Sequence, residues 1–130
     1  CSYLPALMRA EKVQKKAAKV GFDWDDISGA QDKLKEEVSE LNEAVSASDF
    51  AHAKEELGDL LFSCVNVARF LHINPEEALQ DATNKFINRF EKVESAATQD
   101  GKNLADMTLS EMDAIWDRIK AERYSSRSAA

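Results

Sequence analysis

The chain has few of the residues that interrupt helices. It contains four glycines and two prolines among 130 residues, and no stretch alternates apolar and polar side chains as a half-buried strand does. This shortage argues against a loop-rich or all-β domain and favours helices joined by few turns. A hydrophobic content of 44% and a charged content of 32% are typical of a globular chain.

Cysteines and long apolar runs are also scarce. Cys1 and Cys64 are too few for a disulfide framework, and Cys64 lies in an apolar helical run where we expect it to pack as a small hydrophobic side chain. No apolar run is long enough to span a bilayer, and the first residues lack the features of a signal peptide. We therefore expect a cytoplasmic protein without a membrane partner. The absence of an initial Met indicates a trimmed chain or a fragment of a longer one.

Basic residues are outnumbered by acidic ones. The 17 lysines and arginines face 24 aspartates and glutamates, which gives a net charge of −7. Nonspecific nucleic-acid binding depends on a cationic surface, so we do not expect a nucleic-acid partner. A small anionic ligand stays open, because a bound metal ion can reverse the local field.

Apolar residues at helical spacing predict an all-α bundle of about five helices. The predicted ranges, in chain order, are residues 5–19, 29–47, 50–72, 75–97 and 108–123. We expect Ser28 to cap the second helix, Asn74 to cap the fourth, and the pair Thr108 and Glu111 to form a capping box at the fifth. One domain is predicted over residues 1–123, with a loose tail over 124–130.

Four carboxylates form two short pairs that suit a metal ion. Glu37 and Glu40 stand three residues apart, as do Glu56 and Asp59, so the members of each pair are neighbours on their helix. If the two helices pack together, four anionic oxygen donors converge, which is costly without a cation. Oxygen ligands predict a hard divalent ion, Mg²⁺ first and Mn²⁺ as the alternative.

A helical wheel places these pairs differently. Glu37, Glu56 and Asp59 flank the apolar stripes of their helices, whereas Glu40 lies farther round. A second packing surface, such as a partner subunit, would account for Glu40. The alternative is that the carboxylates face water, as charged residues on helices usually do. The protein would then be a non-catalytic helical dimer that acts as a cation-binding or interaction module.

The histidine positions argue against iron. Di-iron bundles use Glu-x-x-His from two helices, but Glu40 and Asp59 occupy the corresponding positions of this chain. We expect His52 at the surface and His72 at a helix end.

A second candidate set is cationic and aromatic. Lys85 and Arg89 stand four residues apart, and Arg89 falls within an apolar stripe, where a cation needs an anionic partner. That partner is either a carboxylate of a neighbouring helix or a phosphate, which Arg binds bidentately. Trp116 and Lys120 share the same spacing. Trp116 either packs in the core or stacks a base, and Lys120 either lies at the surface or binds phosphate.

Taken in order, these segments resemble the MazG family of nucleoside triphosphate pyrophosphohydrolases, and in particular the C-terminal domain of its two-domain bacterial members. The resemblance covers residues 4–123. Its matching segments are KVGFDW at 19–24, EEVSE at 36–40, ELGD at 56–59 and NKFINRF at 84–90, followed by Trp116 and Lys120. Each segment alone is unspecific, but the whole set in this order is specific.

The resemblance implies an all-α bundle that dimerises and hydrolyses nucleoside triphosphates to the monophosphate and pyrophosphate. It implies that Mg²⁺ is held by four carboxylates and that the nucleotide is bound by four further residues. The implied metal ligands are Glu37, Glu40, Glu56 and Asp59, and the implied nucleotide-binding residues are Lys85, Arg89, Trp116 and Lys120. We expect Glu36 or Glu37 to orient the attacking water and Glu56 to be required for turnover. The preferred base and sugar stay open.

Overall fold

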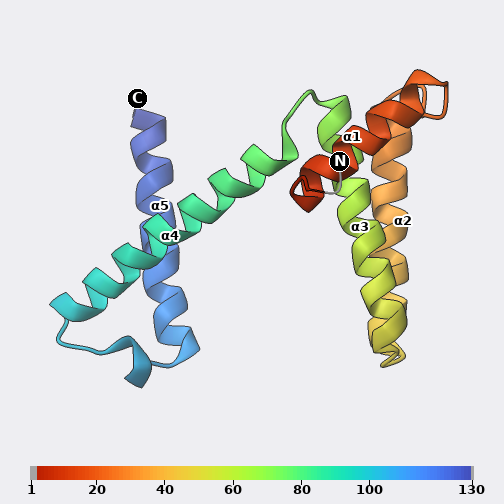
Figure 1. Ribbon diagram of the computed structural model, residues 1–130. Coiled ribbons are helices and arrows are strands. Elements are labelled where there is room, and N and C mark those ends of the chain that lie inside the picture. Colours follow the sequence, from red (N-terminus) through yellow and green to blue (C-terminus); the bar gives the residue numbers. More distant parts are fainter. Residues whose placement is uncertain (1–2, 130) are drawn as a thin grey trace. The chain divides into compact units, whose positions relative to one another are not determined.

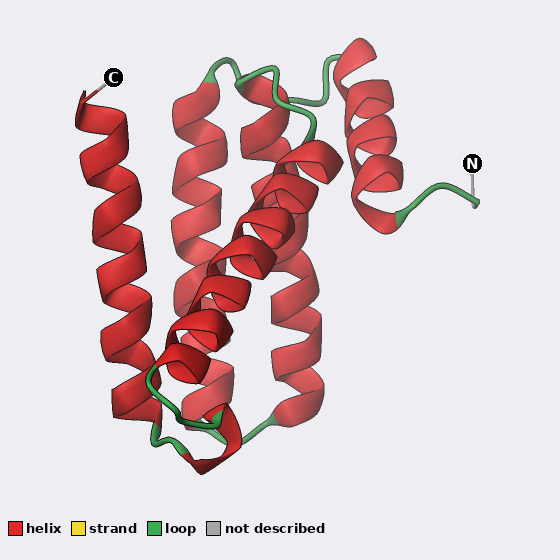
Figure 2. Ribbon diagram, turned by 90° about the vertical axis from the view of Figure 1, so that its left-hand side faces the viewer, coloured by secondary structure: helices red, strands yellow, loops and turns green. Residues whose placement is uncertain are grey.

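The described part of the chain is entirely helix, turn and loop. The computed structural model describes residues 3–129, and side chains over residues 3–122. Within that range there are five α-helices, one short 3₁₀-helix and no strand (Figure 1, Figure 2). These elements are α1 (Ala6–Lys19), α2 (Ile27–Ser46), α3 (Phe50–Phe70), α4 (Pro75–Gln99), η1 (Leu104–Asp106) and α5 (Leu109–Ala129). The prediction of an all-α fold with five helices is confirmed.

The helices form two compact units, one ending at Leu79 and one beginning at Gln80. In the first unit, α2 and α3 pack against each other as an antiparallel pair, joined by the short turn over residues 47–49 (Figure 1), and α1 packs on α3. The small side chains Ala30, Ala44 and Val65 are buried in this unit. The extent of a single domain over residues 1–123 stays a prediction, as does the dimer.

The second unit joins the main part of α4 to α5. The ring of Phe86 on α4 lies 5.3 Å from the ring of Trp116 on α5, measured between centroids. Val93, Ala97 and Ile119 are buried there.

The start of α2 differs from the prediction. Asp26, and not Ser28, is the N-cap, because its carboxylate accepts a hydrogen bond of 2.9 Å from the backbone N–H of Ser28. A carboxylate two residues earlier thus satisfies a free N–H of the first turn and lets the helix begin at Ile27.

The other two predicted helix starts are confirmed. The Asn74 side chain accepts hydrogen bonds from the backbone N–H groups of the first turn of α4. At the start of α5, the N–H of Glu111 donates to Oγ1 of Thr108 at 3.2 Å, and the N–H of Thr108 donates to Oε1 of Glu111 at 3.4 Å. This reciprocal pair is a capping box.

Two sequence expectations are wrong. The last helix was expected to end near Arg123, but α5 runs to Ala129, because residues 124–129 contain neither glycine nor proline to stop it. Cys64 is exposed rather than packed in the core, since α1 and α2 cover other faces of α3. Cys1 lies outside the described residues. Over the described part of the chain, the helices lack an apolar stretch that could cross a bilayer.

Candidate metal and nucleotide site

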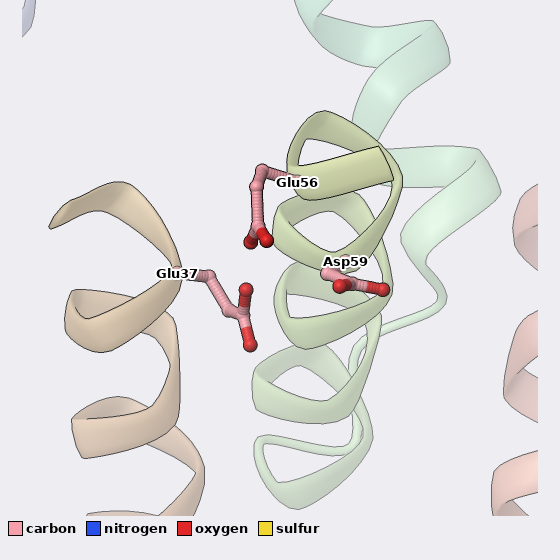
Figure 3. Close-up of side chains that lie close together, drawn as sticks. All are labelled: Glu37, Glu56 and Asp59. Atoms are coloured by element: carbon pink, nitrogen blue, oxygen red, sulfur yellow. The ribbon is translucent and has the colours of Figure 1, made fainter. Parts of the chain in front are cut away.

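Three of the predicted metal ligands lie together in the first unit. Glu37 on α2 and Glu56 and Asp59 on α3 each offer a carboxylate oxygen, and these oxygens all lie within 4.8 Å of one another. Figure 3 shows Glu37 reaching from α2 toward α3, which carries the other two. The i, i+3 spacing of Glu56 and Asp59 places both on one side of α3, and the packing of α2 on α3 adds Glu37.

The two glutamates of this carboxylate cluster are buried. The exposed fraction of Glu37 is 3%, and that of Glu56 is 7%. With the carboxylates ionised, Oε2 of each has no hydrogen-bond donor among the described residues. A buried anionic oxygen without a donor is costly. A divalent cation with oxygen ligands would satisfy both atoms, so the donor set fits Mg²⁺ or Mn²⁺.

Glu40 adjoins the carboxylate cluster without being one of its three members. A hydrogen bond shared with Glu56 is the main cause that raises the pKa of Glu40 to about 7, and burial and the negative charge of Glu37 add to the rise. Glu40 is half-buried. The wheel placed it farther from the apolar stripe, and its contact with Glu56 shows that a side chain as long as glutamate still reaches the cluster. Near neutral pH a proton on Glu40 relieves the repulsion between the carboxylates.

Two basic side chains that the sequence analysis did not assign to the site also contact the cluster. Nζ of Lys33 lies 3.1 Å from Oε1 of Glu37, and Nε2 of His52 lies 2.8 Å from Oε1 of Glu56. The hydrogen bond to Glu56 raises the pKa of His52, and the same bond lowers the pKa of Glu56. Each basic residue stands four positions before its glutamate, and this i, i+4 spacing is the signal that could have found both.

Glu36 is placed differently from the cluster. Its side chain is 56% exposed, and its only ion pair among the described residues is a 3.6 Å contact with Lys33. Glu36 thus shares Lys33 with Glu37 of the cluster. Its exposed carboxylate can accept a hydrogen bond from water.

The cationic set, Lys85, Arg89 and Lys120 among the predicted nucleotide-binding residues, lies in the second unit. Lys85 and Arg89 line a cavity of about 610 Å³ along α4 and α5, together with the unpredicted Lys92. Lys85 and Lys120 are exposed. Arg89 is half-buried and forms no ion pair with the described carboxylates, and its Nε is buried without a hydrogen-bond partner there. The sequence left two kinds of partner open for Arg89, a carboxylate of a neighbouring helix or a phosphate. No described carboxylate pairs with it, which leaves the phosphate.

Trp116 packs and also touches a cation. Its ring is tilted against that of Phe86, and the guanidinium carbon of Arg89 lies 5.8 Å from its centroid. A guanidinium at that distance gains a cation–π attraction. Trp116 therefore helps to hold Arg89 at the rim of the cavity.

The geometry supports a definite chemistry. The carboxylate cluster can hold a hard divalent ion, and the exposed and half-buried cations of the second unit can bind an anion such as a phosphate. Neither set contains a nucleophile such as serine or cysteine. An activated water is therefore the nucleophile that these residues could direct.

A family model and individual relatives among known proteins match the chain and agree on one family. The model of the MazG nucleotide pyrophosphohydrolase domain matches residues 28–94, just over half of the chain. The nucleoside triphosphate pyrophosphohydrolase/pyrophosphatase MazG of Thermotoga maritima is 44% identical over 117 residues, which cover 90% of this chain and 45% of that protein.

Two further relatives agree. The nucleoside triphosphate pyrophosphohydrolase of Escherichia coli K12 is 45% identical over 121 residues, or 92% of this chain and 46% of that protein. The protein YabN of Bacillus subtilis is 51% identical over 67 residues, or 52% of this chain and 14% of its own length. The chain thus spans less than half the length of these relatives. The matched region includes both helices of the carboxylate cluster, and the chain belongs to the MazG nucleotide pyrophosphohydrolase family.

Proposed function

We propose that this protein hydrolyses nucleoside triphosphates to the monophosphate and pyrophosphate, with Mg²⁺ as its metal and Mn²⁺ as a substitute. The observation that carries the proposal is the pair of buried glutamates whose Oε2 atoms have no donor among the described residues. The names of the Thermotoga maritima and Escherichia coli relatives state the same activity for those proteins.

The metal would be held by Glu37, Glu56 and Asp59, with Glu40 joining once it gives up its proton. When bound, the ion supplies charge neutralisation between carboxylates and phosphates and polarises the phosphoryl group. Glu36 is the carboxylate best placed to orient the attacking water, because it is exposed and adjoins the cluster. Glu37 is the second choice for that role, and it is more tightly engaged because Lys33 contacts it.

The cations of the second unit would bind the phosphates. Arg89 would bind bidentately, whereas Lys85 and Lys120 would act as mobile point charges that neutralise the pyrophosphate leaving group. Base stacking by Trp116 stays a prediction from the family resemblance. Its ring already contacts Phe86 and Arg89, which supports a role in positioning Arg89.

A homodimer in the cytoplasm completes the proposal. Several large apolar side chains on α2 and α3 are exposed, among them Val45 at 55% and Leu61 at 51%. Exposed large apolar side chains in this number are typical of a surface that a partner covers. The free thiol of Cys64 is compatible with a reducing compartment. Size-exclusion chromatography with light scattering tests the dimer directly.

The reaction is tested by its products. The protein is incubated with a panel of NTPs and dNTPs, with Mg²⁺ and with EDTA, and the products are separated by ion-exchange chromatography. We expect NMP and pyrophosphate in equal amounts, and none in EDTA. NDP with orthophosphate would place the cleavage at another bond and overturn the proposal.

Thermal melting distinguishes the proposed enzyme from the non-catalytic interaction module. A ligand that binds the folded state stabilises it by mass action. Mg²⁺ with a nonhydrolysable NTP analogue should therefore raise the melting temperature. An unchanged melting temperature at saturating ligand, with no turnover, would favour the interaction module.

A further inference from the structure

His52 stands in the first turn of α3, four residues before the cluster residue Glu56. Its backbone N–H donates a 3.1 Å hydrogen bond to Oδ1 of Asp49, which is the N-cap of the helix. Such a cap satisfies a free N–H of the first turn and keeps that turn helical. The backbone that carries His52 is therefore held by a contact outside the carboxylate cluster.

The imidazole of His52 contacts Glu56 directly. Its Nε2 lies 2.8 Å from Oε1 of Glu56, and the i, i+4 spacing places both side chains on one side of α3. An ionised carboxylate can only accept, so the imidazole donates an N–H in this bond, whether the ring is neutral or charged. The two oxygens of Glu56 therefore differ. Oε1 is engaged by His52, and Oε2 has no donor among the described residues.

This division suits a metal ligand. One oxygen of Glu56 is fixed by the protein, and the other is left for an ion held with Glu37 and Asp59, whose oxygens lie within 4.8 Å. Residues that hydrogen-bond to a metal ligand orient it, and their loss typically weakens metal binding by about 10- to 100-fold. The contact between His52 and Glu56 has the form of such a support.

Glu56 has space to adopt another orientation. A cavity of about 450 Å³ lies beside the turn between α2 and α3, and both Glu56 and His52 line it. The terminal torsion of a glutamate has a broad energy minimum, so little in the side chain itself fixes the carboxylate. Without the bond from His52, the carboxylate could turn toward this cavity, where water would solvate it, and away from Glu37.

His52 is itself accessible. Its side chain is 53% exposed, whereas that of Glu56 is 9% exposed. Nδ1 of His52 lies 3.9 Å from Oδ2 of Asp49, which is longer than a hydrogen bond. The ring thus bonds to Glu56 through one nitrogen and is open to solvent elsewhere. Substitution at such a position usually leaves the fold intact.

We propose that His52 is a positioning residue of the metal site, whose N–H holds Oε1 of Glu56 so that Oε2 is directed at the divalent ion. The proposal rests on the proposed function and adds a residue that sets metal affinity without touching the metal or the nucleotide. The competing account is that a charged imidazole only acts as a counterion in place of the metal. The two accounts differ in sign, because removing a support weakens metal binding, whereas removing a competing cation strengthens it.

Two uncharged variants isolate the hydrogen bond. His52→Gln keeps an N–H donor at the length of Nε2, and His52→Leu keeps an apolar side chain of similar size without a donor. Both remove any charge of the ring, so a difference between them reports the donor. Mn²⁺ is titrated into each protein without nucleotide, and free Mn²⁺ is measured by electron paramagnetic resonance. We expect His52→Leu to bind Mn²⁺ about tenfold or more weakly than His52→Gln, which should bind at least as tightly as wild type.

The same pair of substitutions at Lys54 is the control. Lys54 is an exposed position of the same turn of α3, and its Gln and Leu variants should bind Mn²⁺ equally. Equal affinities of the two His52 variants, or tighter binding by His52→Leu than by wild type, would overturn the proposal. A tenfold difference at Lys54 as well would show a general effect of leucine on α3 and would also overturn it. Circular dichroism checks that each variant keeps its helices.

Kinetics supply a second readout. The Mg²⁺ concentration for half-maximal turnover of ATP should rise in His52→Leu, while kcat at saturating Mg²⁺ should stay within about threefold of wild type. A fall in kcat with an unchanged Mg²⁺ requirement would overturn the positioning role. The outcome for the proposed function is separate. Turnover with equal Mn²⁺ affinities of the two His52 variants keeps the hydrolase and removes this role, whereas a Mn²⁺ difference without turnover removes the hydrolase and keeps a supported metal site.

Discussion

The carboxylate cluster and the cationic set differ in how completely the chain alone assembles them. Glu37 and Glu56 are buried, and their oxygens lie within 4.8 Å of one another and of Asp59. Lys85 and Lys120, by contrast, are exposed. A buried group of like charges is already arranged to bind a cation, whereas exposed lysines remain hydrated and mobile. Loss of one cluster residue should therefore cost more than loss of one cation.

The largest effect is expected from Glu56→Gln. The amide keeps the size of the side chain but removes the charge that the metal requires, so turnover should fall by roughly 10³-fold. Pyrophosphate release at saturating Mg²⁺ measures the loss, and circular dichroism should show unchanged helix content. Glu55→Gln, at the exposed neighbouring position, is the control and should stay near wild type. Comparable losses in both variants would contradict a role specific to Glu56.

An intermediate effect is expected from Arg89→Lys. The change keeps the charge but removes the fork that binds phosphate at two points and the planar contact with Trp116. We expect kcat/KM for ATP to fall by about 10- to 100-fold. Arg9→Lys on α1, where the arginine is exposed, is the control. If Arg89→Lys lost as much as Glu56→Gln, the contrast between the two sets would fail.

The smallest effect is a pH dependence of stability. The pKa of Glu40 is about 7 in the folded protein, above its ordinary value of 4.5, and the pKa of His52 is also raised. Between the ordinary pKa of Glu40 and its pKa of about 7 in the folded protein, the folded state keeps a proton that the unfolded state releases. The stability that this proton contributes is therefore lost as the pH rises through about 7. Melting temperatures without metal should fall by a few degrees between pH 6 and pH 8.

Two controls sharpen this measurement. Saturating Mg²⁺ should remove most of the pH dependence, because the ion replaces the proton in neutralising the cluster. Glu40→Gln should weaken it, leaving the part due to His52. A metal-free melting temperature that rises over this pH range would mean that Glu40 is not protonated by its contact with Glu56.

The local parts of the fold and site could be predicted, and the long-range parts could not. The spacing of Glu56 and Asp59 and the cap at Asn74 depend on neighbours within one helical turn, which the sequence displays. His52 does not match the metal-ligand motif of di-iron bundles, and its link to the site is the i, i+4 spacing to Glu56. The buried side chain of Gln14 on α1 donates a hydrogen bond to a backbone carbonyl of α3 that lies 48 residues away in sequence, and no local pattern carries that information.

The contact between Lys33 and Glu37 has a consequence for how a metal ion arrives. The ammonium lies 3.1 Å from Oε1 of Glu37, whereas Oε2 of the same carboxylate has no partner among the described residues. A divalent ion bound through Oε2 would therefore bring a second positive charge close to the lysine. Repulsion between the two cations would weaken the Lys33 contact and make this side chain available to an incoming anion.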